Sequence, residues 1–192
     1  MAEVSRRHRI GRTQRLLARF ARARGGATTV EFAFVAIPFL LLIFAIIELG
    51  LVFLVSLTLE NAVIDTGRQI RTGELQTAGG TAATFKTAMC KKMSWVGASC
   101  ATALSIDVRT FSGFSSSGSA LNALKPNTPC WDPGGPGSIV MVRAYYSWPL
   151  ITPLLQTGLQ ASGGKRLILA AAAFSNEPYS DTPAAAVTCP SS

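Results

Sequence analysis

Histidine is nearly missing from this chain of 192 residues, because its one copy is His8, close to the N-terminus. The rest of the chain therefore offers no imidazole for a Ser-His or Cys-His nucleophile system. The carboxylates from Glu60 to Asp181 show no paired-acid spacing either. We therefore expect that the protein is not an enzyme and that it needs no cofactor.

Charge is also scarce, and most of the net charge lies at one end. Only 15% of the residues are charged, which is low for a soluble domain and fits a membrane-inserted segment. Residues 1–26 hold eight arginines against one glutamate, so the net charge of +8 belongs mostly to this leader. A basic arm alone can bind nucleic acid. Beside a long apolar run it indicates a cytoplasmic flank that obeys the positive-inside rule, so we expect no nucleic-acid partner.

The cysteines lack the C-x-x-C spacing of a metal site, which argues against zinc. All four follow a long apolar run that begins at Phe32, and they lie in the part of the chain that we expect to be exported. An even number of cysteines in an exported domain indicates two disulfides. Three pairings are open, and we favour a short local loop, Cys90–Cys100, together with Cys130–Cys189.

A long apolar stretch without charged residues follows the leader. No charged residue stands between Glu31 and Glu48, and apolar residues continue to Leu57. About 20 apolar residues suffice to cross the hydrocarbon core, so the run indicates a transmembrane helix surrounded by membrane lipid. A secretory signal peptide is the competing interpretation. The run is longer than a usual signal peptide's apolar region, however, and no clear small-x-small site follows it.

Helical periodicity continues beyond the apolar run. Leu59, Val63 and Ile70, with Ala62 between them, form one apolar stripe on an otherwise polar segment. Glycine after a helix often serves as its C-cap, and Gly73 stands at that position. We therefore predict one helix from about Ala27 to about Thr72. Its first half lies in lipid, and its second half packs against an exported domain.

Two carboxylates flank the apolar run. Glu31 lies five residues past Gly26, inside the start of the helix, where a carboxylate in lipid needs a partner charge or a proton. A cut after Gly26 would supply that partner as the α-amine of Ala27. Glu48 lies about one membrane span further on, so we expect it near the outer interface and in reach of water. A role for Glu48 in assembly is the alternative.

These residues together resemble a known processing signal. A basic leader, a small residue at the cut, a glutamate five residues on, the aromatic Phe32 and an apolar helix are similar to the class III signal of type IV pilin-like proteins. The segment from Arg24 to Val35, with Pro38 inside the apolar run, most resembles the TadE-like pseudopilins of the tight adherence (Flp pilus) machinery. Their typical segment is R-G-A-x-x-V-E-F-A, and this chain has one extra glycine. A cut after Gly25 is therefore also open, but a cut after Gly26 keeps Glu31 at the fifth position.

Pro38 removes one backbone hydrogen bond, so we expect it to kink the helix. We count it with Glu31 and Glu48 among the candidate assembly residues.

The remainder of the chain alternates strand, loop and helix patterns. Period-two alternation predicts strands at 104–111 and 139–146. A third strand is predicted at 166–174, where the alanines leave a helix open. Helical spacing of Phe85, Met89 and Met93 predicts a helix within 81–96, and a second is predicted at 154–160. Residues 112–138 are rich in Gly, Ser and Pro and indicate a long surface loop.

Two features of this region invite a chemical interpretation that we reject. The glycine and proline cluster at 133–137 lacks the Lys-Ser or Lys-Thr of a P-loop. Asp107 and Arg109 share one face of their strand, and we expect a solvated pair.

The closing part of the chain carries a second resemblance. Residues 140–150 and 167–179, which end in Asn176-Glu177-Pro178-Tyr179, are similar to the closing blocks of TadE-like proteins, which often end near R-N-E-P-Y. Here Ser175 stands where the family has a basic residue. The predicted fold is α+β and pseudopilin-like: a long helix packed on about three antiparallel strands with one or two short helices. Its parts are a leader (1–26), a transmembrane and extended helix (27–73), an exported domain (74–179) and a flexible tail (180–192).

The resemblance implies a function and a location. It implies a minor pseudopilin that a prepilin peptidase cuts after Gly26, in a single pass of the bacterial inner membrane with its N-terminus in the cytoplasm. Its expected partners are the other pilin and pseudopilin subunits and the inner-membrane assembly platform, and its expected role is in pilus biogenesis and adhesion. The family carries no known catalytic residues. The alternative is an uncut, membrane-anchored scaffold or binding protein with an exported domain.

Overall fold

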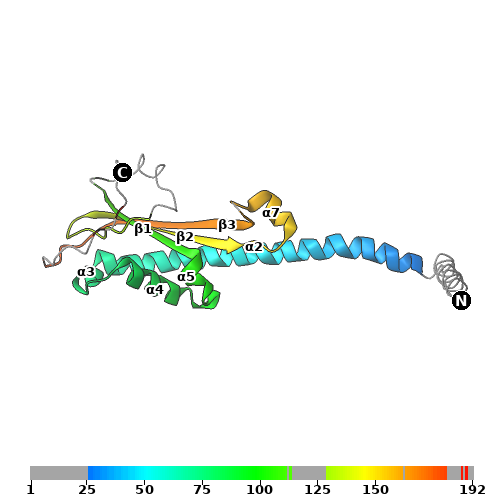
Figure 1. The fold of residues 1–192 in the computed structure, drawn as a ribbon, viewed down its shortest axis with the longest axis horizontal. Coiled ribbons are helices and arrows are strands. Elements are labelled where there is room, and N and C mark those ends of the chain that lie inside the picture. Colours follow the sequence, from blue (N-terminus) through cyan, green and yellow to red (C-terminus); the bar gives the residue numbers. More distant parts are fainter. Residues whose placement is uncertain are drawn as a thin grey trace, which may run out of the picture. The chain divides into compact units, whose positions relative to one another are not determined.

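The fold is α+β, with a long helix packed on a three-stranded antiparallel sheet, as predicted (Figure 1). The computed structural model describes residues 26–111, 113, 129–161, 163–180, 187 and 189. The predicted leader lies outside these residues, apart from Gly26. The elements in chain order are α2 (Ala27–Arg71), α3 (Glu74–Thr77), α4 (Ala82–Lys92), the 3-10 turn η2 (Ser94–Val96), α5 (Ser99–Ala103), β1 (Leu104–Phe111), β2 (Ile139–Pro149), α7 (Pro153–Leu159) and β3 (Lys165–Ser175).

The chain divides into two compact units, and the boundary falls within α2. The first unit ends at Phe44, and the second, Ala45–Ser192, contains the rest of α2 and the whole sheet.

The bounds of α2 agree with the predicted helix, from Ala27 to about Thr72, to within one residue. Gly73 follows the helix with a left-handed φ of 77°, as expected of a glycine that ends a helix.

The sheet has the strand order β1-β2-β3, and both pairings are antiparallel. Residues 166–174 form a strand, so the helix left open by their alanines is excluded. Pairing with β2 over eleven positions decides this, because ladder hydrogen bonds outweigh the weak intrinsic preference of alanine. The strand also passes close to α2. A Cβ atom on Gly67 would lie 3.1 Å from the ring of Phe174.

One core joins the second half of α2 to the sheet. The predicted stripe of Leu59, Ala62, Val63 and Ile70 is at most 1% exposed, and Val55 extends it by one turn. The predicted helix stripe of α4 is equally buried and belongs to the same cluster as the inward-facing residues of all three strands. The apolar periodicity therefore identified the packing faces correctly.

The secondary structure departs from the prediction in its short elements. Helices α3 and α5 were not predicted, because four or five residues carry too little periodicity to detect. The helix expected within 81–96 ends at Lys92, and η2 follows it. A reciprocal hydrogen-bond pair between Thr81 and Thr84 caps its start.

The expected surface loop at 112–138 is partly core. Residues 112 and 114–128 lie outside the described residues. Trp131, however, forms a parallel bridge with Val108 at the edge of β1 and is 3% exposed. Its ring centroid lies 5.4 Å from that of Phe85. The prediction of a surface loop was therefore wrong at this end, because a single tryptophan among glycines and prolines gives no periodic signal.

Candidate functional site

The start of α2 presents the predicted processing residues without cover from the described residues. Gly26 is exposed and directly precedes the helix, which begins at Ala27. Glu31 is exposed, and Phe32 is 73% exposed. Pro38 lies inside the helix with an exposed ring. Among the described residues, Gly26, at the predicted cut, and Glu31 are therefore both exposed.

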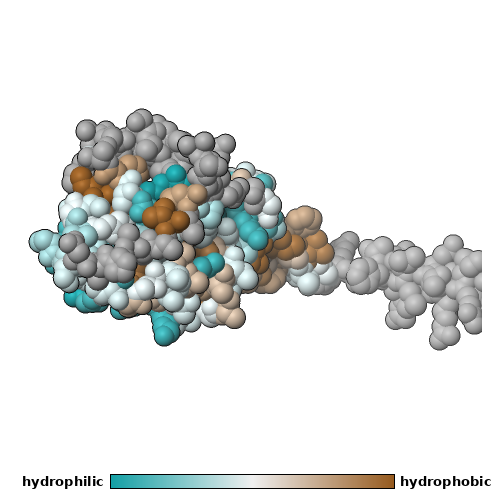
Figure 2. All heavy atoms as spheres, turned by 60° about the vertical axis from the view of Figure 1, so that its left-hand side comes forward, coloured by the Kyte–Doolittle hydropathy of each residue, from teal (hydrophilic) through white to brown (hydrophobic). Residues whose placement is uncertain are grey.

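Apolar exposure then continues around the helix. The large apolar side chains from Val30 to Ile47 are 42–76% exposed, apart from the half-buried Ile43. The helix is long and apolar enough to cross a membrane, by its length and composition. Figure 2 shows hydrophobic colour along the helix where it leaves the sheet domain, whereas the visible face of that domain is mixed in colour. Such a surface is stable in lipid or against other helices rather than in water.

Glu48 has a different environment from the one expected. Its side chain was expected to reach water, but it is only 5% exposed. The carboxylate accepts hydrogen bonds from two backbone N–H groups, those of Ile151 and Thr152, the latter at 2.8 Å. These residues join β2 to α7, and the N–H groups satisfy an acid that would otherwise be costly to bury. The expectation failed because the partners lie about a hundred residues away in sequence.

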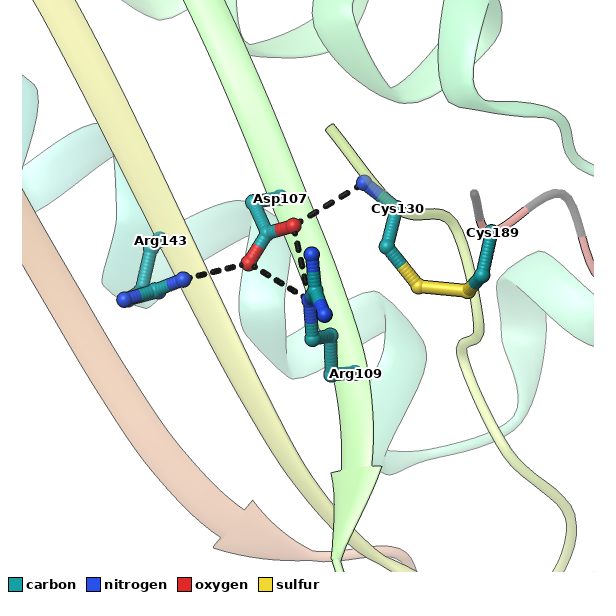
Figure 3. A network of polar contacts seen from close by, with 5 residues as sticks. All are labelled: Asp107, Arg109, Cys130, Arg143 and Cys189. Atoms are coloured by element: carbon teal, nitrogen blue, oxygen red, sulfur yellow. Dashed lines mark hydrogen bonds and ion pairs between the residues drawn. A yellow bond between two sulfur atoms is a disulfide. The ribbon is translucent and has the colours of Figure 1, made fainter. Parts of the chain in front are cut away.

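A buried ion network lies on the sheet face opposite α2 (Figure 3). Asp107 is 2% exposed and accepts hydrogen bonds from Arg109 Nε at 3.0 Å, Arg143 Nη2 at 2.7 Å and the Cys130 N–H at 2.9 Å. The expected pair of Asp107 and Arg109 does form, but the expectation that it is solvated was wrong, because Asp107 is buried. Asp107 pairs with Arg143 across the strands, and the chain at Cys130 covers them. Sequence reasoning missed Arg143, since only the register aligns it with Asp107.

Both disulfides have the pairing that we favoured. Cys90 is joined to Cys100, and Cys130 is joined to Cys189. The first links α4 to α5, and the second joins Cys189 to Cys130, next to Trp131 at the edge of β1. The predicted flexible tail (180–192) lies outside the described residues, apart from residues 180, 187 and 189.

The closing block Asn176-Glu177-Pro178-Tyr179 fastens the far end of α2. The buried amide of Asn176 donates to the carbonyls of Pro133 and Gly135, each at 3.0 Å. Glu177 pairs with Arg71 at the end of α2, and its N–H donates to the Arg71 carbonyl. The sequence showed the motif, and the structure shows that it acts as a clamp.

Tyr179 completes this clamp by packing on Gly73. A Cβ atom on Gly73 would lie 2.5 Å from the tyrosine ring, so only glycine fits there. The Tyr179 hydroxyl lies 3.4 Å from the Gly134 carbonyl, and burial raises the pKa of this phenol.

One pocket of the sheet domain is lined mainly by apolar residues. A pocket of about 260 Å³ lies between α4, β1 and residues 129–131. Lys86 and Ser105 are the polar side chains that line it, beside apolar residues, and its described lining includes neither an imidazole nor a carboxylate. Among the residues that the structure describes, no group of three His, Cys, Asp or Glu side chains could hold a metal ion.

Comparison with known families supports the resemblance seen in the sequence. A family model described as TadE-like protein matches residues 26–68, which include Glu31, Pro38 and Glu48. The family indicates a role in Tad pilus assembly and interaction with other pilus components. A search among curated proteins and a search among solved structures each find no match. The closing block lies outside the matched residues.

Proposed function

We propose that this chain is a minor pseudopilin of a tight adherence (Flp pilus) machinery. A prepilin peptidase cuts it after Gly26, and its α2 helix anchors it in the bacterial inner membrane with the sheet domain exported. It assembles with other pilin and pseudopilin subunits on the inner-membrane platform and supports pilus biogenesis and surface adhesion. Its proposed role is structural and not enzymatic.

One observation carries this proposal. The family match begins at Gly26 and covers the helix segment whose apolar side chains are exposed, with Glu31 near its start. A glutamate is expensive among lipid-facing side chains unless a partner charge is near. Cutting after Gly26 would create an α-amine on Ala27, which is a positive charge that can pair with a carboxylate.

Glu31 and Glu48 of α2 differ in the hydrogen-bond partners that they already have. Glu48 is already held by two N–H groups of its own sheet domain. Glu31 is exposed, so it is the carboxylate that a neighbouring subunit could reach. In an assembly of staggered parallel helices, the amine of one subunit pairs with Glu31 of the next. Breaking such a pair by removing one partner costs about 3–5 kcal/mol by analogy with buried pairs, so the pair selects the register of assembly.

The mass of the mature chain tests the proposal. Protein extracted from the membranes of cells with an active prepilin peptidase is expected to begin at Ala27. Gly26→Leu is expected to block the cut, because the peptidase needs a small residue there. Gly50→Leu is the matched control, since a side chain at Gly50 meets nothing within 4 Å.

The same measurement separates the two proposed fates of the chain. A mature chain that still begins at Met1 or Ala2 would overturn the pseudopilin proposal and favour the uncut membrane-anchored scaffold. A chain that begins at Gly26 would place the cut after Gly25. Repeating the spectrum with reductant counts the disulfides in the same sample.

A further inference from the structure

One end of the sheet domain exposes large apolar side chains that its fold does not use. Ile151 is 79% exposed, more than any other large apolar side chain among the described residues. Trp95 is 43% exposed, and its ring centroid lies 6.2 Å from that of Trp148. Exposed tryptophan and isoleucine are costly in water, which indicates that something covers them.

The contacts of Glu48 show which part of α2 lies beside this end of the domain. Its carboxylate holds the N–H groups of Ile151 and Thr152, so the β2–α7 connection lies beside the helix at that residue. Trp148 lies on β2 three residues before Ile151. The exposed apolar residues are therefore gathered where α2 enters the unit that begins at Ala45.

The uncovered side of α2 stays apolar well beyond this level. Phe53 is 64% exposed and Leu57 is 42% exposed, although Val55 and Leu59 on the other side are fully buried in the core. At about 1.5 Å per residue, Leu57 lies about 14 Å beyond Glu48 along the helix. A bilayer that covers this uncovered side must therefore reach the level of Glu48 and Ile151.

Two cations stand at the same end. Lys165 and Arg166 begin β3, where they pair with Pro149 and Trp148 of β2. Both are exposed, and the Arg166 guanidinium donates to the carbonyl of Leu159 at the end of α7. Long cationic side chains next to aromatic and apolar ones are typical of the membrane–water interface, where the charges reach the lipid headgroups.

We propose that this end of the domain rests in the headgroup region of a bilayer that contains anionic phospholipid. We call it the membrane-facing end and define it as Trp95, Trp148, Ile151, Lys165 and Arg166. Trp95 and Ile151 enter the interface, with the half-buried ring of Trp148 packed beside Trp95, and the two cations bind lipid phosphates. The proposal rests on the proposed anchoring of α2 and adds that the domain lies down on the membrane.

The burial of Glu48 has a reason in this arrangement. A carboxylate at the depth of the headgroups or below would be costly if it faced lipid. The N–H groups of Ile151 and Thr152 donate hydrogen bonds to the carboxylate, which lowers the cost of burying it, and the Ile151 side chain is exposed at the same place. The same contact therefore hides the acid and presents an apolar residue to the bilayer.

Quenching of tryptophan fluorescence by brominated phospholipid tests the proposal. The chain holds three tryptophans, and Trp131 is buried beside Phe85, so it serves as an internal reference. The cut, full-length chain is reconstituted in vesicles whose lipids carry bromine near the carbonyl end of the acyl chains. We expect strong quenching in the native chain, less in Trp95→Phe, and almost none in the double variant with Trp148→Phe.

Failure of this inference can be told apart from failure of the anchor. If the chain floats with the vesicles but the native protein and Trp95→Phe are quenched equally, the domain stands clear of the bilayer and the inference is overturned. If the chain does not float with the vesicles, the anchor itself fails and both proposals fall. Trp95→Phe alone decides the test if Trp148→Phe does not fold, because Trp95 is partly exposed.

A charge reversal tests the lipid class. We expect the double variant Lys165→Glu and Arg166→Glu to lower quenching severalfold on vesicles containing phosphatidylglycerol. Reversal of Arg68 and Lys86 is the matched control with the same change in net charge. Arg68 lies near the far end of α2, and Lys86 lines the pocket near Trp131. Equal quenching in both double variants would overturn the assignment to anionic lipid.

Discussion

The two halves of α2 are one continuous helix with opposite surroundings. From Val30 to Ile47 the large apolar side chains other than Ile43 are 42–76% exposed, whereas Val55, Leu59, Val63 and Ile70 in the second half are at most 1% exposed. Both halves are rich in Leu, Ile and Val, so residue type alone does not account for the contrast. The first half is apolar on every side. The second half buries one apolar stripe against the sheet, and its uncovered side stays apolar as far as Leu57 and is mostly polar beyond it. An all-round apolar surface suits lipid or neighbouring helices, and a single stripe suits a sheet.

Glu48 stands between these halves and belongs to the second. Its hydrogen bonds go to the connection between β2 and α7, while Glu31 remains exposed in the first half. The comparison therefore assigns the first half to contacts with other molecules and the second half to the fold of this one. The experiments below test that division.

The largest expected effect is on assembly. Glu31→Ala is expected to insert into the membrane and to be cut, yet to lose co-purification with the pilus machinery, because the neighbour's amine has no partner. Glu60→Ala, which removes an exposed carboxylate in the second half, is the control and is expected to co-purify normally. Quantitative pull-down from detergent extracts measures both. Normal co-purification of Glu31→Ala would contradict the role assigned to the first half.

Truncation of leucine tests the same division through stability. Leu59→Ala is expected to destabilise the sheet domain by about 2–5 kcal/mol, since Leu59 is fully buried and leaves a cavity. Leu41→Ala, at a position that is 42% exposed, is expected to leave that stability unchanged. Urea unfolding of the detergent-solubilised chain, followed by tryptophan fluorescence, reports the domain that holds all three tryptophans. Equal losses in the two variants would remove the contrast between the halves.

Glu48→Gln tests the residue that stands between the two halves of α2. The two N–H groups reach different oxygens of Glu48, so glutamine in the same position accepts from one of them and turns its NH₂ group toward the other donor. An unsatisfied buried donor costs about 1–3 kcal/mol, so we expect a loss of that size in the urea experiment. Glu60→Gln removes a charge from an exposed position and is expected to change little. Equal stability of the two variants would show that Glu48 is not needed for the fold.

The smallest expected effect is a difference in stability between two glycine substitutions, one of them at the end of the helix. Gly73→Ala introduces a side chain at a left-handed φ of 77° and against the Tyr179 ring, so we expect a loss of about 1–3 kcal/mol. Gly79→Ala has a similar φ of 63° but open space, so only the backbone cost of about 1–2 kcal/mol is expected. The difference between the two midpoints in urea isolates the contact with Tyr179. No difference would mean that the ring moves aside.

The sequence was most informative where the pattern was local. Periodicity located α2, the packing stripe at Leu59 and Val63, and the three strands, because side-chain spacing reports directly on which face is buried. The motif from Gly26 to Phe32 was sufficient to indicate the family, and the family match begins at the same residue. The disulfide partners were among only three possible pairings, so a preference for a short loop was enough.

Local pattern was least informative where the partner was distant. Asp107 was expected in water because Arg109 was the only visible neighbour, whereas Arg143 and Cys130 complete its network. The segment around Trp131 was expected to be a loop, yet it packs at the edge of β1. Both errors arise because strand register and loop closure depend on residues far apart in the chain.

The sequence by itself determined that this protein has a long helix after a basic segment and an α+β domain, because these follow from composition and spacing, and a resemblance to the TadE-like family suggested the processing site. Only the tertiary structure decided that Glu48 is buried under the β2–α7 connection and that the closing block clamps the end of α2. The physical reason is that a buried polar group must find a partner. Which backbone N–H or carbonyl comes within about 3 Å of it is decided only when the whole chain has packed.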